Sequence, residues 1–202
     1  MDGFEARVLW WHEPFNYSAV NNHAVDAARG ELLVFLNDDC RVRSADWLHE
    51  LAGWATQGGI GTVGVQLIGA EGTIQHGGVV LGLSGFADHL FAGLPPDSET
   101  WLGSTNWYRN TMANTAACVA VRRGVFEEVG GFDERFELLG SDVALGLACH
   151  GRGYRNVTTP MIDVDHLESV TRGPAVPSHD MFASYWWYQR WLRVGIPSTR
   201  RT

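Results

Sequence analysis

Residues 31–39 read Glu-Leu-Leu-Val-Phe-Leu-Asn-Asp-Asp. The run from Leu32 to Leu36 is wholly apolar, as in a buried strand of a mainly parallel sheet. It ends in Asn37, Asp38 and Asp39, at the carboxyl end of the strand, where open α/β sheets bind ligands. A divalent cation with oxygen ligands is the usual reason to keep two adjacent carboxylates ionised. The alternative is that the pair starts a turn or caps the next helix.

Helical and strand patterns alternate on both sides of this segment, which indicates an α/β protein. Helices are predicted over residues 17–28, 45–56, 125–129, 142–150 and 178–194. Strands are predicted over residues 4–11, 61–68, 73–81, 116–121, 154–158 and 162–165. Ser18 and Ser141 are expected as N-caps, and Pro160 is expected to end a strand. Residues 83–105, rich in Gly and Pro, are expected to form a mobile surface loop near the predicted ligand site.

The composition indicates one globular domain over residues 1–202. Hydrophobic residues are 45% and charged residues 19% of the 202, so a sizeable core is expected. No apolar run approaches the roughly 20 residues of a transmembrane helix, and the first residues do not resemble a signal peptide. The formal charge of -8 argues against a generic nucleic-acid surface.

The cysteine and lysine counts exclude several kinds of chemistry. The three cysteines are far apart and form no CxxC pair, which suits a reducing compartment better than a disulfide scaffold. All 15 basic residues are arginine. A Schiff-base lysine is therefore excluded, and so is a P-loop, which needs GK[ST].

Two further residues have both a structural and a functional interpretation. Asp142 follows Ser141 in the first turn of a predicted helix. It either stabilises the helix dipole or acts as general base for a hydroxyl nucleophile. His166 follows two acidic strand positions, Asp163 and Asp165. It is either structural or the third group of a metal site begun by the aspartate pair.

Five ordered blocks, taken together, resemble the family 2 glycosyltransferases of the GT-A fold, and rhamnosyltransferase-like enzymes of bacterial surface polysaccharide synthesis in particular. The blocks read ELLVFLNDD, GTIQHGGVVLG, RRGVFEEVGGFDERF, SDVALGLACHGRGYR and HLESVTRG. The resemblance covers residues 15–173, followed by an amphipathic helix at 178–194. It implies a Rossmann-like, mixed and mainly parallel sheet flanked by helices, with residues 32–36 central.

The resemblance also implies roles for single residues. Asp39 and His166 would hold Mg²⁺ or Mn²⁺, and Asp142 would be the catalytic base. Three residues would contact the donor nucleotide-sugar: Asn16, Asn22 and Asp38. Asn37 and Ala144 depart from the acidic residues that many relatives have at those positions.

The implied activity is inverting transfer of a sugar from a nucleotide-sugar to a saccharide or lipid-linked acceptor. It would take place in the cytoplasm or at the inner face of the membrane. The aromatic residues of the helix at 178–194 either pack on the sheet or contact the membrane surface. The chain opens where the family's nucleotide-binding segment should end, so it resembles a domain lacking about 80 residues, the size of one to two βα units. We therefore expect low activity alone, self-association, or a partner chain supplying that half. The alternative is a non-catalytic remnant or one half of a split transferase.

Overall fold

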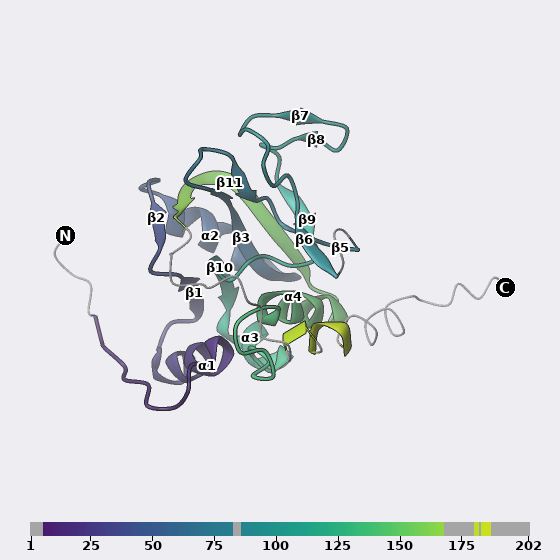
Figure 1. Ribbon diagram of the computed structural model, residues 1–202. Coiled ribbons are helices and arrows are strands. Elements are labelled where there is room, and N and C mark those ends of the chain that lie inside the picture. The colour runs from purple at the N-terminus through teal and green to yellow at the C-terminus, as the bar shows by residue number, and fades with distance from the viewer. Residues whose placement is uncertain (1–5, 83–85, 168–179, 182, 187–202) are drawn as a thin grey trace.

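A computed structural model describes residues 6–82, 86–167, 180, 181 and 183–186. Its centre is a seven-stranded sheet with the order β1-β10-β3-β11-β2, to which β4 adds beside β3 and β9 beside β11 (Figure 1). These strands are β1 (Leu32–Leu36), β2 (Cys40–Val42), β3 (Ile60–Ile68), β4 (Ile74–His76), β9 (Arg109–Thr111), β10 (Cys118–Arg122) and β11 (Arg155–His166). Two small sheets pair β5 (Val79–Leu81) with β6 (Ala87–His89), and β7 (Glu99–Thr100) with β8 (Gly103–Ser104).

Helices cover both faces of the large sheet (Figure 1). On one face lies α2 (Trp47–Ala55), whose Leu51 and Ala55 are fully buried against the sheet. On the other face lie α1 (Tyr17–Ala27), α3 (Arg123–Val129) and α4 (Ser141–Gly151). This layered α/β architecture confirms the predicted fold class. Within the described residues, no helix is both long enough and apolar enough to cross a bilayer.

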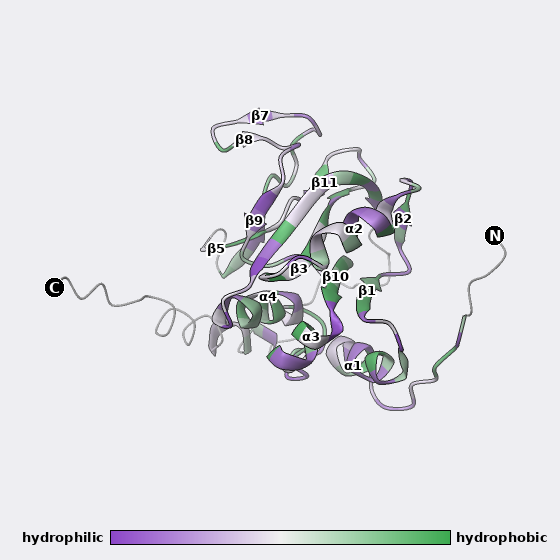
Figure 2. Ribbon diagram, turned by 180° about the vertical axis from the view of Figure 1, so that it is seen from behind, coloured by the Kyte–Doolittle hydropathy of each residue, from purple (hydrophilic) through white to green (hydrophobic). Residues whose placement is uncertain are grey.

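The position of β1 differs from the prediction. It lies at the end of the strand order, and among the described residues it pairs only with β10, in antiparallel orientation. Leu33 and Phe35 are buried in the core beneath α1, α3 and α4, whereas Leu32 and Val34 pack against the core beneath α2. The apolar run therefore reflects helices on both faces, visible as the green β1 in Figure 2, and carries no information about neighbouring strands.

The sheet is mixed, but it is not mainly parallel among the strands described. Only β3 and β11 pair in parallel, and every other described pair is antiparallel. The reason is that β10 inserts between β1 and β3 and runs opposite to both. The hydrophobic pattern identifies strands in covered sheets without giving their direction.

Several predicted boundaries are also wrong. Residues 73–81 form two strands in different sheets, because Gly78 has a φ of 104° and turns the chain after β4. In contrast, β11 continues through Pro160, which lies within an irregularity of the β3–β11 register between Thr159 and Val164. A proline is tolerated there because no regular ladder bond needs its missing N–H.

The predictions also cover the N-caps of two helices and the structure of three further segments. Asn16 and Gly140 are the N-caps of α1 and α4, in place of the expected Ser18 and Ser141. Residues 6–12 have no regular secondary structure, so the strand expected at 4–11 is absent from its described part. Residues 83–105 include β6, β7 and β8 where only a loop was expected. Of the helix expected at 178–194, residues 180, 181 and 183–186 are helical, and the others lie outside the described residues.

Candidate active site

The register of two strands brings Asp39 and His166 together. Cys40 begins β2 and pairs with His166, the last residue of β11. Asp39, one position before β2, accepts a backbone hydrogen bond from Leu167 at 3.0 Å. As a result, Asp39 Oδ1 lies 3.1 Å from His166 Nε2, and the two side chains are only 15% and 9% exposed. Two residues predicted to share a metal site are thus in contact.

Gln75, in β4, sets the orientation of the His166 ring. Nδ1 of His166 lies 2.5 Å from Gln75 Oε1, so that nitrogen carries the proton and donates it to the amide oxygen. With the proton on Nδ1, the lone pair of Nε2 would be available to a cation shared with the Asp39 carboxylate. A second hydrogen bond of this kind is typical of histidines that bind metals, because it fixes both tautomer and ring orientation.

The separation of these two atoms suits a divalent cation. Neighbouring ligands of an octahedral Mg²⁺, each at 2.0–2.1 Å, lie about 3 Å apart. The Asp39–His166 distance of 3.1 Å agrees with this value. Carboxylate oxygen and imidazole nitrogen are ligands that Mg²⁺ or Mn²⁺ can accept. The residues present therefore fit the metal ion that the family resemblance implies.

Cys40 completes a cluster with Asp39 and His166 in which the candidate ligand atoms lie within 4.8 Å of one another. Its Sγ donates to Ala117 O at 3.3 Å. Burial, reinforced by the neighbouring Asp39 carboxylate, raises the pKa of the Cys40 thiol to about 11. Because a protonated thiol is a poor ligand for a hard cation, we assign Cys40 to the wall of the site.

Asp142 and His166 open onto one cavity of about 150 Å³. Asp142 lies in the first turn of α4, where its Oδ1 accepts the Val143 N–H at 2.8 Å and its Oδ2 the Ala116 N–H at 3.4 Å. These bonds hold the carboxylate at the cavity wall. Asn37 and Gln75 contribute further polar lining.

The three residues expected to contact the donor lie elsewhere. Asp38 is exposed in the turn between β1 and β2 and does not line the cavity. Asn16 caps α1 by accepting the Ala19 N–H at 2.9 Å and donates to Glu134 O at 2.8 Å. Asn22 donates to Phe132 O at 2.9 Å and accepts the Phe132 N–H at 3.0 Å.

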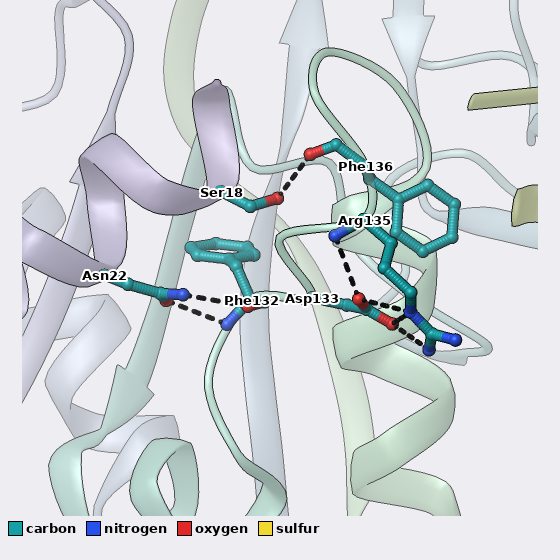
Figure 3. Close-up of polar contacts among 6 residues, drawn as sticks. All are labelled: Ser18, Asn22, Phe132, Asp133, Arg135 and Phe136. Atoms are coloured by element: carbon teal, nitrogen blue, oxygen red, sulfur yellow. Dashed lines mark hydrogen bonds and ion pairs between the residues drawn. The ribbon is translucent and has the colours of Figure 1, made fainter. Parts of the chain in front are cut away.

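These contacts of α1 and its N-cap hold the loop that precedes α4 in place, and they give no evidence of ligand binding. Figure 3 shows Asn22 engaged with Phe132, and Ser18 donating to Phe136 O at 2.8 Å. The loop ends at α4, so these bonds support the position of Asp142. The structure brings Asp39 into contact with His166, which lines the same cavity as Asp142, whereas Asn16 and Asn22 do not line that cavity.

Sequence patterns did not single out Gln75, His76 or His89, all of which line the cavity. Gln75 and His76 lie in the block GTIQHGGVVLG, which contributed to the family resemblance without roles for its polar residues. His89 lies in the segment expected to be a loop. For Gln75 and His76, the available signal was two adjacent polar residues within the strand predicted at 73–81.

Comparison with known proteins agrees with this architecture. Residues 2–130 match the family described as Glycosyl transferase family 2. The chain is 48% identical over 186 residues to the O-antigen biosynthesis protein RfbC of Myxococcus xanthus, covering 91% of this chain and 15% of that protein. It is 37% identical over 65 residues to an N-acetylglucosaminyl-diphospho-decaprenol L-rhamnosyltransferase of Mycobacterium tuberculosis, covering 32% and 21% of the two chains. The chain thus spans only a small part of the length of these curated relatives.

Two solved structures share the fold at low sequence identity. GalNAc-T7 with UDP, GalNAc and Mn²⁺ superimposes with a TM-score of 0.58 at 15% identity, covering 77% of this chain and 31% of that one. The mannosyltransferase PcManGT of Pyrobaculum calidifontis, in complex with GDP-Man and Mn²⁺, has a TM-score of 0.51 at 16% identity, covering 89% and 53%. On these grounds the chain belongs to glycosyl transferase family 2 and has the GT-A fold.

Proposed function

We propose that this chain catalyses metal-dependent, inverting transfer of a sugar from a nucleotide-sugar to a saccharide or lipid-linked acceptor, in the synthesis of a bacterial surface polysaccharide. One observation carries the proposal: a carboxylate in the first turn of α4 and a histidine paired with an aspartate meet at a single cavity. Family membership and the O-antigen relative support the same class of reaction.

Asp142 supplies the base. An acceptor hydroxyl in the cavity would donate its proton to the Asp142 carboxylate while its oxygen attacks the anomeric carbon, opposite the leaving diphosphate. The backbone N–H groups of Val143 and Ala116 hold the carboxylate in place for this step. General base catalysis of this kind typically contributes 10²–10⁴-fold.

Asp39 and His166 would hold Mg²⁺ or Mn²⁺ beside this cavity, with Gln75 orienting the imidazole. Such an ion would supply positive charge to the departing diphosphate. The two structural neighbours contain Mn²⁺ together with UDP or GDP-Man, which supports a divalent ion without selecting between Mg²⁺ and Mn²⁺. Asp38, exposed in the adjoining turn, remains a proposed donor contact.

We place the reaction in the cytoplasm or at the inner face of the membrane. The three cysteines are free, as suits a reducing compartment. The M. tuberculosis relative is named for a lipid-linked acceptor, which supports an acceptor of that class here. A non-catalytic remnant is less well supported, because the proposed base Asp142 lines the same cavity as His166, which contacts Asp39.

Donor binding and turnover together test the proposal. Calorimetry with UDP-, GDP- and dTDP-sugars should show binding to the purified chain that strengthens with Mn²⁺. With an extract of lipid-linked saccharides as acceptor, Asp142→Asn should lower sugar transfer by about 10²–10⁴-fold and leave donor binding unchanged. Asp163→Asn, at an exposed position outside the cavity, is the matched control. Metal-independent donor binding, or transfer that survives Asp142→Asn, would refute the proposal.

A further inference from the structure

Two histidines that the proposed mechanism leaves unused contact each other at the edge of the active-site cavity. His76 ends β4 and is 1% exposed, whereas His89 ends β6 and is exposed. Their Nδ1 atoms lie 2.7 Å apart, and their rings meet edge to face with centroids 4.8 Å apart. The other nitrogen of His76, Nε2, accepts the backbone N–H of Thr115 at 3.3 Å.

These two contacts determine where the protons lie. A neutral imidazole has one N–H donor and one acceptor nitrogen. Because Nε2 of His76 accepts, its proton must be on Nδ1, from which it donates to Nδ1 of His89. His89, accepting at Nδ1, therefore carries its own proton on Nε2. Burial, with further contributions from His89 and His166, lowers the pKa of His76 well below its ordinary value, so that His76 stays neutral in this arrangement.

His89 lies where two cavities meet. His89 lines the cavity that holds Asp142 and His166, and it also lines a larger cavity of about 630 Å³. Asp142 lines both cavities as well, whereas neither Asp39 nor His166 lines the larger one. His89 and Asp142 thus share the side of the site that faces away from the proposed metal pair. Among the described residues, no hydrogen-bond partner is found for His89 Nε2.

The larger cavity has mostly apolar walls with a few polar groups. The apolar part is formed by Val79, Leu81, Phe86, Phe136, Leu147 and Met181. Asp88, Asp180 and Ser184 add polar atoms. A mainly apolar hollow with a small number of polar groups is typical of a site for an uncharged organic ligand. A diphosphate would instead be expected beside the cation, at Asp39 and His166.

We propose that His89 binds the acceptor saccharide, donating its Nε2–H to an oxygen next to the hydroxyl that faces Asp142, and that His76 is a positioning residue that holds His89 in this tautomer. The assignment rests on the proposed function. A neutral N–H donor beside a carboxylate acceptor matches two neighbouring oxygens of one sugar ring, and it would favour one hydroxyl of the acceptor as the nucleophile.

A spectroscopic measurement tests the tautomer without any need for activity. Long-range ¹H–¹⁵N correlation spectra of the ¹⁵N-histidine-labelled chain should show His89 protonated at Nε2 and unprotonated at Nδ1. His76→Leu should convert His89 to a mixture of tautomers, whereas His76→Asn, whose amide N–H can replace Nδ1–H, should restore most of the wild-type signal. A wild-type His89 protonated at Nδ1, or a signal unaffected by His76→Leu in a folded variant, would overturn the positioning role.

Kinetics test the acceptor contact. With methyl glycosides of N-acetylglucosamine and rhamnose as acceptor probes, His89→Leu should raise the acceptor KM about 3–10-fold, the effect of one neutral hydrogen bond. Hydrolysis of the donor without acceptor should be unchanged. His89→Gln, which keeps an N–H at similar reach, should stay near wild type, as should His49→Leu at an exposed position on α2. An unchanged acceptor KM, or a raised donor KM instead, would overturn the proposal.

Failure of the proposed function would be seen separately. If the wild-type chain neither binds nor turns over a nucleotide-sugar, the transferase assignment fails. The same methyl glycosides, titrated into the labelled chain, then decide the present inference. A saturable shift of the His89 Nε2–H signal during the titration supports saccharide binding at this position. No shift with either glycoside refutes it.

Discussion

At the scale of single residues, His166 uses its two ring nitrogens for different purposes. Nδ1 donates to Gln75, and Nε2 faces Asp39. The first contact makes the second possible, because protonation at Nδ1 leaves the Nε2 lone pair available to a cation. Gln75 thus acts on the proposed metal site without belonging to its ligands.

This division of roles predicts a graded loss of Mn²⁺ binding. Gln75→Leu should weaken Mn²⁺ affinity about 10–100-fold, the usual cost of losing the partner of a ligating histidine. His166→Ala and Asp39→Asn should each weaken it further, because they remove a ligand. Electron paramagnetic resonance of free Mn²⁺ during titration measures the affinities of the wild type and of these three variants. Gln57→Leu, at an exposed site after α2, is the control, and an affinity equal to wild type in Gln75→Leu would contradict the role of Gln75.

At the scale of elements, β11 positions the site. It runs parallel to β3, passes Pro160 without ending, and delivers His166 to the register with β2. Its starting point is fixed by Asn156, which is fully buried. The Asn156 amide accepts the N–H and hydroxyl of Thr62 and donates to the carbonyls of Met112 and Gly146. One side chain thus joins β11 to β3, to α4 and to the segment after β9.

Replacing this asparagine should destabilise the whole domain. Asn156→Leu would leave several buried polar groups without partners, at a cost of about 1–3 kcal/mol each, so we expect the free energy of unfolding to fall by at least about 3 kcal/mol. Urea denaturation followed by circular dichroism measures it. Asn110→Leu, at an exposed position of β9 that pairs with Val157, should change it by less than about 0.5 kcal/mol. Equal effects of the two substitutions would contradict this account.

At the scale of the whole molecule, one edge of the sheet has no neighbouring strand among the described residues. The only described neighbour of β1 is β10, so its other side offers backbone groups for pairing. Leu36 in β1 is 42% exposed, and the preceding segment exposes Trp10 and Phe15. An open strand edge beside apolar surface favours association with another chain.

We therefore predict self-association through this edge. Sedimentation should give a mass above that of the 22.3 kDa chain, rising with protein concentration. Leu36→Lys should shift the distribution toward the monomer, because a charged residue on an edge strand disfavours further pairing. Leu94→Lys, at a comparably exposed position outside the large sheet, should have no such effect. A monodisperse monomer at all concentrations would show that the edge is not used.

The sequence by itself determined the class of fold, the family and most of the helices and strands. The continuous apolar run over residues 32–36 predicted a buried strand, and β1 is covered on both faces. The sequence also identified Asp39, Asp142 and His166 as candidate site residues, because each belongs to one of the ordered blocks that resemble the family. An apolar run that indicates burial of both faces of a strand does not, however, reveal which strands are its neighbours or in which direction they run.

Those relations were decided only by the tertiary structure. The contact between Asp39 and His166 depends on the register of β2 against β11, and the place of β1 at an edge depends on the insertion of β10. Asn16 and Asn22 serve the loop before α4 because that loop packs beside α1. His76 and His89 form a pair because β4 and β6 approach each other. Each is a contact between separate elements of the chain. Local sequence patterns predict the elements themselves but not which of them will pack against one another.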